Sequence, residues 1–329
     1  MAPELKKQTY CGFEVLAIDG TTLTLPKSNE LINDFGVLKS RSGVDSYPKA
    51  RASVLYDCLN DTIIDSKIDK LATGEHTLFY QHLDLIDDNP NRIVVIDRGY
   101  ESANIFKKII SKKSNFCCRM RNQWRLVKGF IQSDDMDTII DVRHSGASIR
   151  KAKKLGLNTE NFNVRLVKIE LEDSIEILAT SLLDPKYDLE FFKKLYHLRW
   201  RVEESYKTMK CRIKIEKFMG KSTEAIKQEF YGKIMMLNIT IAQIKEAEKQ
   251  VKDDNKGRKF AYKINVKAAL SKVKRVGVIL FNSTKKRMKD VLEILTIKMI
   301  ADLTPIRPDR RFPHRKRIST AIIQNYGTI

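Results

Sequence analysis

Two short apolar segments of this chain each end in an aspartate. FEVLAID (13–19) ends at Asp19, and IVVID (93–97) ends at Asp97. Apolar runs of this length without polar alternation are typical of strands buried on both faces of a sheet. An acidic side chain at the end of such a strand is costly to leave without a partner. The two segments therefore predict a central sheet covered by helices, with a carboxylate at the end of two of its strands.

Strand and helix patterns alternate along the first third of the chain. After Asp19 we expect a turn and then an alternating segment to residue 25, and the composition of 28–48 indicates a loop. The pattern over 50–70 predicts a hairpin that turns at Asn60-Asp61. The elements expected next are a helix over 75–86, the strand before Asp97, a helix over 102–113 and a strand over 115–120.

The pattern becomes β-rich between residues 123 and 182. LVKGFIQ, TIIDVRH, NVRLVKIEL and IEILATS each indicate a strand, and Glu172-Asp173-Ser174 indicates a hairpin turn between the last two. Asp188 is a suitable N-cap for the long helix that follows. Beyond it we expect a helix over 224–248, a mostly helical Lys-rich region over 258–298, and an extended basic tail over 307–317.

These patterns divide the chain into four segments. They are the first part of an α/β core (1–122), a β-rich insertion (123–185), the second part of the core (186–250), and a helical C-terminal region with a basic tail (251–329).

The segment YHLRWRVEESYKTMK (196–210) has no Gly or Pro and predicts a continuous helix. Its apolar positions form one stripe, made of Leu195, Leu198, Val202, Tyr206, Met209 and Ile213. Tyr196, Arg199, Glu203 and Lys210 form a second stripe, about a quarter turn away at roughly 100° per residue. A carboxylate that lines a cleft would lie on this second stripe, at the edge of the buried face.

The charge of the chain indicates a polyanionic partner. Lys and Arg total 61 against 41 Asp and Glu, which gives a net charge of +20, and nucleic acid is the first partner that such a charge suggests. The 42% of hydrophobic residues is enough to form a core and excludes a disordered composition. We expect no membrane span, because the longest apolar run is short.

The five cysteines predict neither disulfides nor a zinc site, because they are odd in number and form no CxxC pair. This usage fits a reducing compartment. Cys117 and Cys118 are adjacent on an expected strand, and we expect both to be packing residues.

Asp19, Asp97 and Glu203 together suggest a metal-dependent reaction. Three carboxylates in one cleft repel each other unless cations neutralise them, and carboxylate oxygens favour Mg²⁺ or Mn²⁺. Two such ions can activate a nucleophile and stabilise a leaving oxygen in phosphoryl transfer. Each acid also has an ordinary structural interpretation. Asp19 can belong to a turn at Asp19-Gly20, and Asp97 to a strand-to-helix turn at Asp97-Arg98-Gly99. Glu203 can form a helical ion pair with Arg199.

The motifs in combination resemble those of DDE-type insertion-sequence transposases, in particular the insertion sequence four family. That family's signature of Tyr, Arg, Glu and Lys has the spacing of Tyr196, Arg199, Glu203 and Lys210, and Trp200 follows the Arg as is common there. AIDGTTLTLP and VVIDRGY resemble its two Asp motifs, and ATSLLDPKYD and TPIRPDRRFPHRKR resemble further segments. The resemblance covers nearly the whole chain.

The resemblance implies a ribonuclease-H-like fold with a β-rich insertion between the second Asp and the Glu. Asp19, Asp97 and Glu203 would be catalytic and hold Mg²⁺ or Mn²⁺. DNA would be bound by Tyr196, Arg199, Trp200 and Lys210. The implied reaction is hydrolysis at a transposon end, followed by attack of the new 3′ hydroxyl on target DNA. The implied partners are double-stranded DNA and a second copy of the chain on paired ends, in a bacterial or archaeal cytoplasm at the nucleoid.

Relatives usually carry a helical region before the first Asp motif that helps to recognise the inverted repeats, whereas here Asp19 comes almost at once. Either the true start lies upstream or this is a truncated copy, so we expect strong DNA binding with little sequence preference. Two alternatives to an active transposase stay open. One is a truncated DNA-binding copy that inhibits the full-length enzyme, and the other is a ribonuclease-H-like nuclease with another substrate.

Overall fold

The computed structural model describes residues 7–38, 47–171, 174–254 and 260–306. The described residues divide into two compact units. The first comprises 7–23, 35–37 and most of 49–207, and the second comprises 24–34, 38, 47–48 and the described part of 208–306. The four segment boundaries expected from the sequence stay a prediction.

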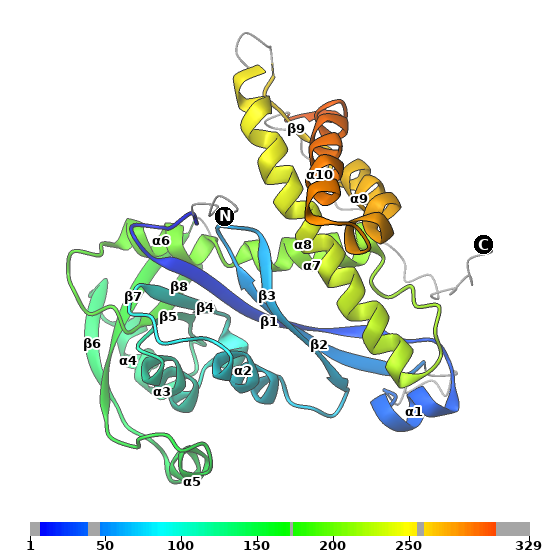
Figure 1. Cartoon of the computed structure of the whole chain (residues 1–329). Coiled ribbons are helices and arrows are strands. Elements are labelled where there is room, and N and C mark those ends of the chain that lie inside the picture. Colours follow the sequence, from blue (N-terminus) through cyan, green and yellow to red (C-terminus); the bar gives the residue numbers. More distant parts are fainter. Residues whose placement is uncertain (1–6, 39–46, 172–173, 255–259, 307–329) are drawn as a thin grey trace. The chain divides into compact units, whose positions relative to one another are not determined.

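A mixed sheet forms the centre of the first unit (Figure 1). Its described strands lie in the order β3-β2-β1-β4-β5-β8-β7-β6. β1 pairs with β4 and β4 with β5 in parallel, whereas β2 with β3 and the pairs among β5, β8, β7 and β6 are antiparallel. The strands are β1 (Glu14–Thr24), β2 (Lys49–Asp57), β3 (Thr62–Lys70), β4 (Arg92–Ile96), β5 (Asn115–Arg119), β6 (Asp137–Val142), β7 (Phe162–Leu171) and β8 (Ser174–Thr180). The predicted α/β class is confirmed.

Helices cover both faces of this sheet (Figure 1). They are α2 (Glu75–Asp84), the 3-10 helix η1 (Arg98–Tyr100), α3 (Ala103–Ser111), α4 (Arg125–Gln132), α5 (Gly146–Lys154), α6 (Leu189–His197) and α7 (Trp200–Thr208). On one face, Phe79 of α2 and Phe106 of α3 are fully buried in one hydrophobic cluster with Leu16, Val94 and Phe116 of the sheet. The rings of Phe106 and Phe116 stack with centroids 4.2 Å apart.

The alternation of side chains along β1 assigns its acid to the opposite face. Leu16 and Ile18 belong to the cluster with α2 and α3, so Val15, Ala17 and Asp19 project to the other side of the sheet. α6 and α7 lie on that side (Figure 1). The alternation therefore places Asp19 on the face that carries Glu203.

Two predictions for the first fifty residues are wrong. β1 is one strand that continues through Asp19 and Gly20 to Thr24, where we expected a turn. The stretch expected to be a loop contains α1 (Asn29–Phe35). Ser28 caps this helix, because its hydroxyl accepts a hydrogen bond from the Leu31 backbone N–H at 3.2 Å.

LVKGFIQ was predicted to be a strand but forms most of α4 (Arg125–Gln132). Val127 and Phe130 are buried, and Ile131 packs against the same cluster. Their spacing of three and four residues matches the helical period, which the short apolar run hid. The strands expected for TIIDVRH, NVRLVKIEL and IEILATS are confirmed as β6, β7 and β8. The turn at Glu172-Asp173 and the tail 307–317 lie outside the described residues.

The predicted continuous helix is interrupted. α6 ends at His197 and α7 begins at Trp200, and the backbone N–H of Arg199 donates to the Tyr196 carbonyl over a tightened turn at 3.0 Å. Asp188 caps α6 as expected, accepting from the Phe191 N–H at 2.7 Å. The break has no Gly or Pro. It coincides with the buried side chain of Arg199, so tertiary contacts rather than local propensity explain it.

The second unit is mainly helical. Its described elements are α1, a π-helical turn (Met209–Ile213), α8 (Thr223–Asp254), β9 (Tyr262–Ile264), α9 (Val266–Phe281), α10 (Lys285–Ile300) and β10 (Leu303–Pro305). α8, α9 and α10 share a core that includes Ile244, Val273 and Leu295. The helices expected over 224–248 and within 258–298 are confirmed.

Cys117 and Cys118 are both fully buried on β5 and unbonded to each other, which confirms their prediction as packing residues. No helix in the described part of the chain combines the length and the apolar character that a bilayer crossing requires.

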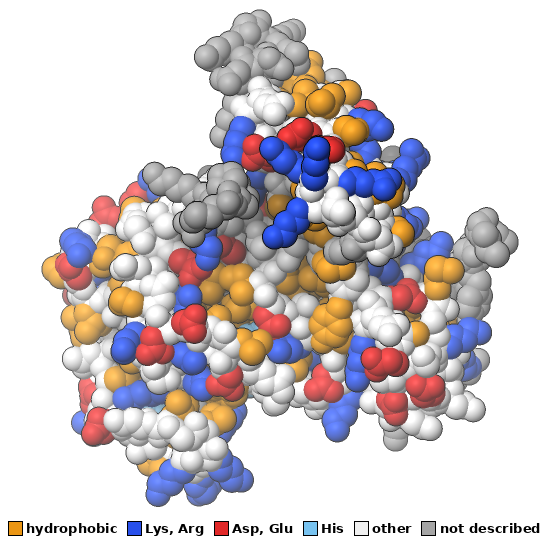
Figure 2. Space-filling view, in the orientation of Figure 1, with side chains coloured by type: hydrophobic (Ala, Val, Ile, Leu, Met, Phe, Trp, Pro, Cys, Tyr) orange, Lys and Arg blue, Asp and Glu red, His pale blue; other side chains and the backbone are white. Residues whose placement is uncertain are grey.

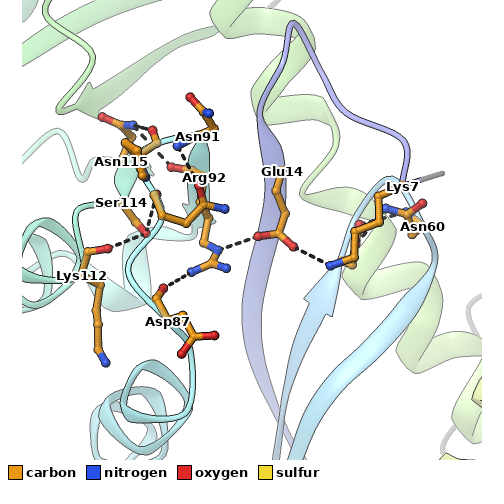
Figure 3. Close-up of polar contacts among 12 residues, drawn as sticks. Lys7, Glu14, Asn60, Asp87, Asn91, Arg92, Lys112, Ser114 and Asn115 are labelled. Carbon is orange, nitrogen blue, oxygen red and sulfur yellow. Dashed lines mark hydrogen bonds and ion pairs between the residues drawn. The ribbon is translucent and has the colours of Figure 1, made fainter. Parts of the chain in front are cut away.

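A polar cluster fixes the edge of the sheet at which β1, β4 and β5 begin (Figure 3). Arg92 Nε donates to Glu14 Oε2 at 2.6 Å, and Arg92 Nη1 donates to the Asp87 carbonyl at 2.6 Å. Glu14 and Arg92 are directly paired in the β1–β4 register, and both side chains are nearly buried. Nearby, Asn115 Nδ2 of β5 donates to the Pro90 carbonyl at 3.0 Å. This ion pair therefore fixes how β1 is aligned with β4.

We expect Glu14→Gln to lower the free energy of unfolding by about 1–3 kcal/mol, because Arg92 loses its charged acceptor in a nearly buried place. Urea denaturation measures the change. Lys7→Gln is the matched control, since Lys7 contacts the same carboxylate at 3.5 Å from an exposed position and should contribute less than about 1 kcal/mol. Equal losses in the two variants would contradict the role given to the Glu14–Arg92 pair.

Candidate active site

The parallel register sets Asp19 and Asp97 level with each other. Ala17 pairs with Val95. Asp19 lies two residues further along β1, and Asp97 lies two residues after Val95, directly beyond the end of β4 at Ile96. Positions level in a parallel pair project to the same face, which for β1 is the face of α6 and α7. β4 also pairs with β5 in parallel, with Ile96 opposite Cys118. Arg119, the next residue of β5, is therefore level with Asp97. Neighbouring strands are about 4.8 Å apart.

Glu203 lies on α7, on the same side of the sheet as Asp19. Its Oε1 lies 2.7 Å from Arg199 Nη2, four residues earlier. The Arg199 side chain is only 6% exposed, and that of Glu203 is 32% exposed. The Arg199 guanidinium also lies 5.5 Å from the ring centres of both Tyr196 and Trp200, within the range of a cation–π contact. Arg199 is thus held by two aromatic rings and one carboxylate.

The pKa of Asp19 depends on burial and on the charged groups around it. Burial is the main cause that raises it, from 3.8 to about 6. The Gly20 N–H, which donates to Asp19 Oδ1 at 2.8 Å, and Arg199 both lower it. Glu203 and Asp97 raise it further. Asp97, Glu203 and Arg199 thus lie within electrostatic reach of Asp19, and the four residues are called here the acid cluster.

The backbone of Asp19 is held from two sides. Tyr206 of α7 donates its hydroxyl to the Asp19 carbonyl at 2.7 Å, and Ser53 Oγ of β2 lies 3.1 Å from the same oxygen. Ser53 Oγ also lies 3.0 Å from His82 Nε2, whose Nδ1 is 2.7 Å from Asp65 Oδ2. Ser53 and His82 are fully buried or nearly so. A buried chain of polar groups thus connects β3, α2 and β2 to the acid of β1.

Hydrogen bonds keep Asp65 ionised in this chain. Burial by itself would raise the pKa of Asp65, but the hydrogen bonds and charges of His82 and Lys67 hold it below its ordinary value. Ser53, His82 and Asp65 were not among the residues predicted from the sequence. A serine in an apolar strand and a histidine in a helix carry no local signal of this kind. Their partnership is visible only after the strands and α2 are assembled.

Two of the predicted DNA-binding residues carry buried donors without a protein acceptor. Within the described residues, Tyr196 Oη and Arg199 Nε have no hydrogen-bond partner. Burial also raises the pKa of Tyr196 well above its usual range, so its hydroxyl keeps its proton. A buried donor without an acceptor costs about 1–3 kcal/mol, and both donors therefore favour a ligand with acceptor oxygens.

The Trp200 side chain is half exposed and lies outside the hydrophobic core. With Tyr196 and Leu198 it lines a pocket of about 550 Å³ that also includes Lys193 and Lys194. Lys210 lies in the second unit, in the π-helical turn Met209–Ile213. The structure thus brings Tyr196, Arg199, Trp200 and Glu203 together within the first unit.

Lys and Arg side chains also gather at α5 (Figure 2). This helix carries Arg150, Lys151, Lys153 and Lys154 without an acidic residue. A surface of this kind attracts polyanions without reading sequence.

Two of the acids also form the structural contacts that the sequence suggested for them. Glu203 does form the helical ion pair with Arg199, and Asp97 Oδ1 does accept from the Arg98 N–H at 2.7 Å at the start of η1. Among the residues that the structure describes, no three His, Cys, Asp or Glu side chains are arranged to hold a metal ion. The acid cluster supplies the donor types of a divalent-metal site without the arrangement of one, and Glu203 is paired with Arg199.

Comparison with known proteins identifies the family. The family model described as "Transposase DDE domain" matches residues 10–239, and the chain belongs to this family. Its fold is of the α/β class that the sequence predicted, while the ribonuclease-H-like fold and the β-rich insertion that the resemblance implies stay predictions.

Searches among individual proteins add less. The search of curated proteins found no significant match. A solved structure that is similar is the cryo-EM structure of the piggyBac transposase synaptic complex with hairpin DNA, at 12% identity and a TM-score of 0.45. The match covers 86% of this chain and 57% of that one.

Asp19→Asn should raise the free energy of unfolding at pH 7.5 by on the order of 2 kcal/mol, since one pKa unit corresponds to about 1.4 kcal/mol. A carboxyl whose pKa is higher in the folded state binds its proton more tightly there. The wild type therefore loses stability as pH rises from about 4 to about 6. Urea denaturation should show the gain at pH 7.5 and its absence near pH 4. An equal gain in the free energy of unfolding at pH 7.5 and near pH 4 would exclude the ionisation of Asp19 as its source.

His82→Leu should lower the free energy of unfolding by about 1–3 kcal/mol, because Ser53 and Asp65 then lose a buried partner. The control is His76→Leu in the same helix, where the ring is partly exposed and contacts only the Gly99 carbonyl by hydrogen bond, at 2.9 Å. Thermal and urea unfolding compare the two variants. If His76→Leu is the more damaging change, the buried chain does not hold β1 and β2 together.

Proposed function

We propose that this protein is a DNA transposase that cleaves DNA at transposon ends and joins the new 3′ hydroxyl to target DNA. The observation that carries the proposal is the acid cluster. Asp19 and Asp97 are level on adjacent parallel strands, and Glu203 is close enough to raise the pKa of Asp19, in a chain of the transposase DDE domain family. The assignment to the insertion sequence four family stays a prediction.

Asp19, Asp97 and Glu203 are the residues that would hold a divalent cation. Their oxygens are the donors that Mg²⁺ and Mn²⁺ prefer. Burial is the main cause that raises the pKa of Asp19, and the charges of Glu203 and Asp97 add to it. When bound, such an ion activates the attacking oxygen and stabilises the leaving one. Because Glu203 is paired with Arg199, binding would require that carboxylate to be shared or released.

Arg199 and Tyr196 are suited to hold the phosphate that reacts. Their buried donors have no protein acceptor in the described residues, and Arg199 remains positioned by the Tyr196 and Trp200 rings if Glu203 is released. An arginine can donate two parallel hydrogen bonds to a phosphate. In this proposal Trp200 stacks on a base through its exposed ring, and Lys210 contributes a further phosphate contact.

The partners follow from the same proposal. Double-stranded DNA is the substrate, both as transposon end and as target, and the net charge of +20 favours it. Two copies of the chain would act together on paired ends, in the bacterial or archaeal cytoplasm at the nucleoid.

A second candidate function is a DNA-binding protein without catalysis that inhibits an active transposase. It is favoured by the absence, among the described side chains, of three that are arranged to hold a metal ion. It shares the DNA contacts of the first candidate, and cleavage separates the two.

Asp97→Asn should abolish Mg²⁺-dependent cleavage while DNA affinity stays within a few-fold of the wild type, because the change removes a metal ligand without touching a phosphate contact. The assay uses the purified chain, Mg²⁺ and a labelled duplex carrying the DNA that flanks its gene. Asp88→Asn is the control, because Asp88 is an exposed aspartate paired with Lys113 near the start of β5.

Full cleavage by Asp97→Asn would show that this acid is structural. Binding without any cleavage by the wild type, in Mg²⁺ and in Mn²⁺, would favour the inhibitory DNA-binding protein.

A further inference from the structure

We propose that a second anion site beside the acid cluster binds a backbone phosphate of the DNA strand that is cleaved. The site is a pocket of about 380 Å³ where β5 ends, β8 begins and η1 passes. We call it the arginine pocket. The lining residues that carry the argument are Arg98, Arg119, Arg121, Asn122, Gln123 and Glu176. The inference rests on the proposed function, which names DNA as the substrate.

The register places the arginine pocket next to the proposed reaction centre. Arg119 is level with Asp97, one residue beyond the Ile96–Cys118 pair of β4 and β5, and projects to the same face. One strand spacing of about 4.8 Å separates the two positions. Arg98 follows Asp97 directly and donates its backbone N–H to that carboxylate. A strand whose phosphate reaches Asp97 therefore brings a neighbouring phosphate to these arginines.

The charges in the arginine pocket are unbalanced. Three arginines line the pocket with one carboxylate, that of Glu176, which lies 3.0 Å from Arg119 Nη2. Two further carboxylates adjoin it, since Glu101 accepts from the Arg121 N–H and Asp97 from the Arg98 N–H. Arg98 and Arg121 are exposed, and neither guanidinium has an ion-pair partner within 4 Å among the residues described. Like charges gathered in a concave site repel one another, and an anion bound between them removes that repulsion. The pocket thus favours an anion over a neutral ligand.

The chemistry of the donors favours a phosphodiester. Arginine forks match the geometry of phosphate oxygens, and the Asn122 and Gln123 amides add neutral donors at the same rim. Phosphate contacts of this kind position a nucleic acid without reporting its sequence.

Glu176 has a specific part in this site. It lines both the arginine pocket and the pocket that contains Trp200. Its carboxylate forms an ion pair with Arg119. A phosphate that binds Arg119 must compete with this carboxylate. Removal of the Glu176 charge should therefore strengthen DNA binding rather than weaken it.

The test is a salt titration of DNA binding with the full chain, by fluorescence anisotropy of a labelled duplex in EDTA. The double variant Arg98→Gln/Arg121→Gln should make the plot of log K against log salt concentration shallower by about 0.9, one phosphate contact. Affinity at the lowest salt concentration should fall correspondingly. The control is Lys112→Gln/Lys113→Gln, which removes the same charge next to the other end of β5 and should leave the slope nearly unchanged.

A gain-of-function arm keeps the test decisive if the arginine variant does not fold. Glu176→Gln should bind the duplex several-fold more tightly, because Arg119 becomes free to bind phosphate. Its control is Asp88→Asn, which frees Lys113 in the same way at the other edge of the sheet. The proposal is overturned if Glu176→Gln binds no better than Asp88→Asn, or if a folded arginine double variant keeps the wild-type slope.

This result is independent of the cleavage assay. If the arginine double variant keeps the wild-type salt slope while Asp97→Asn loses cleavage, the proposed phosphate site is wrong and the transposase proposal is still supported. If the arginine double variant has a shallower slope while Asp97→Asn cleaves fully, the phosphate site is supported and the catalytic role of Asp97 is contradicted.

Discussion

The parallel alignment of β1 with β4 is the constraint on which the proposed site depends. The nearly buried Glu14–Arg92 pair fixes this alignment at the edge where the strands begin. Five residues further along each strand, the same alignment sets Asp19 level with Asp97. A slip of one residue would turn one of the two carboxylates to the opposite face, where the apolar cluster of α2 and α3 lies. The ion pair at one end of the strands thus bears on where the two aspartates lie at the other end.

The electrostatics of the site reflect opposing charges held close together. Asp19, Asp97 and Glu203 repel one another, and Arg199 offsets part of this repulsion from the α7 side while Arg119 lies level with Asp97 on the next strand. Both arginines are paired with carboxylates, Glu203 and Glu176. A phosphate and a divalent cation together could replace these internal pairs, since each brings the charge that one partner would lose. We therefore regard the ion pairs as the form of the site without substrate.

Local patterns in the sequence predicted much of the sheet and the positions of the acids. The apolar runs before Asp19 and Asp97 predicted β1 and β4 because buried parallel strands need no polar alternation. The break before Arg199 was not predictable, since no Gly or Pro marks it and the cause is burial of the arginine itself. α4 was misassigned because a short apolar run fits both periods. The partnership of Ser53, His82 and Asp65 joins three elements and exists only in the folded chain.

The central claim is that one register brings Asp19, Asp97 and Glu203 together as the ligands of a divalent cation. A crystal of the chain soaked in Mn²⁺ tests it most directly through the anomalous signal of the metal. The account predicts a peak on the α7 side of the sheet, with carboxylate oxygens of both aspartates within roughly 2.0–2.3 Å, close to the distances known for such cations. Crystals that bind Mn²⁺ only elsewhere, or in which the two aspartates point to opposite faces of the sheet, would contradict it.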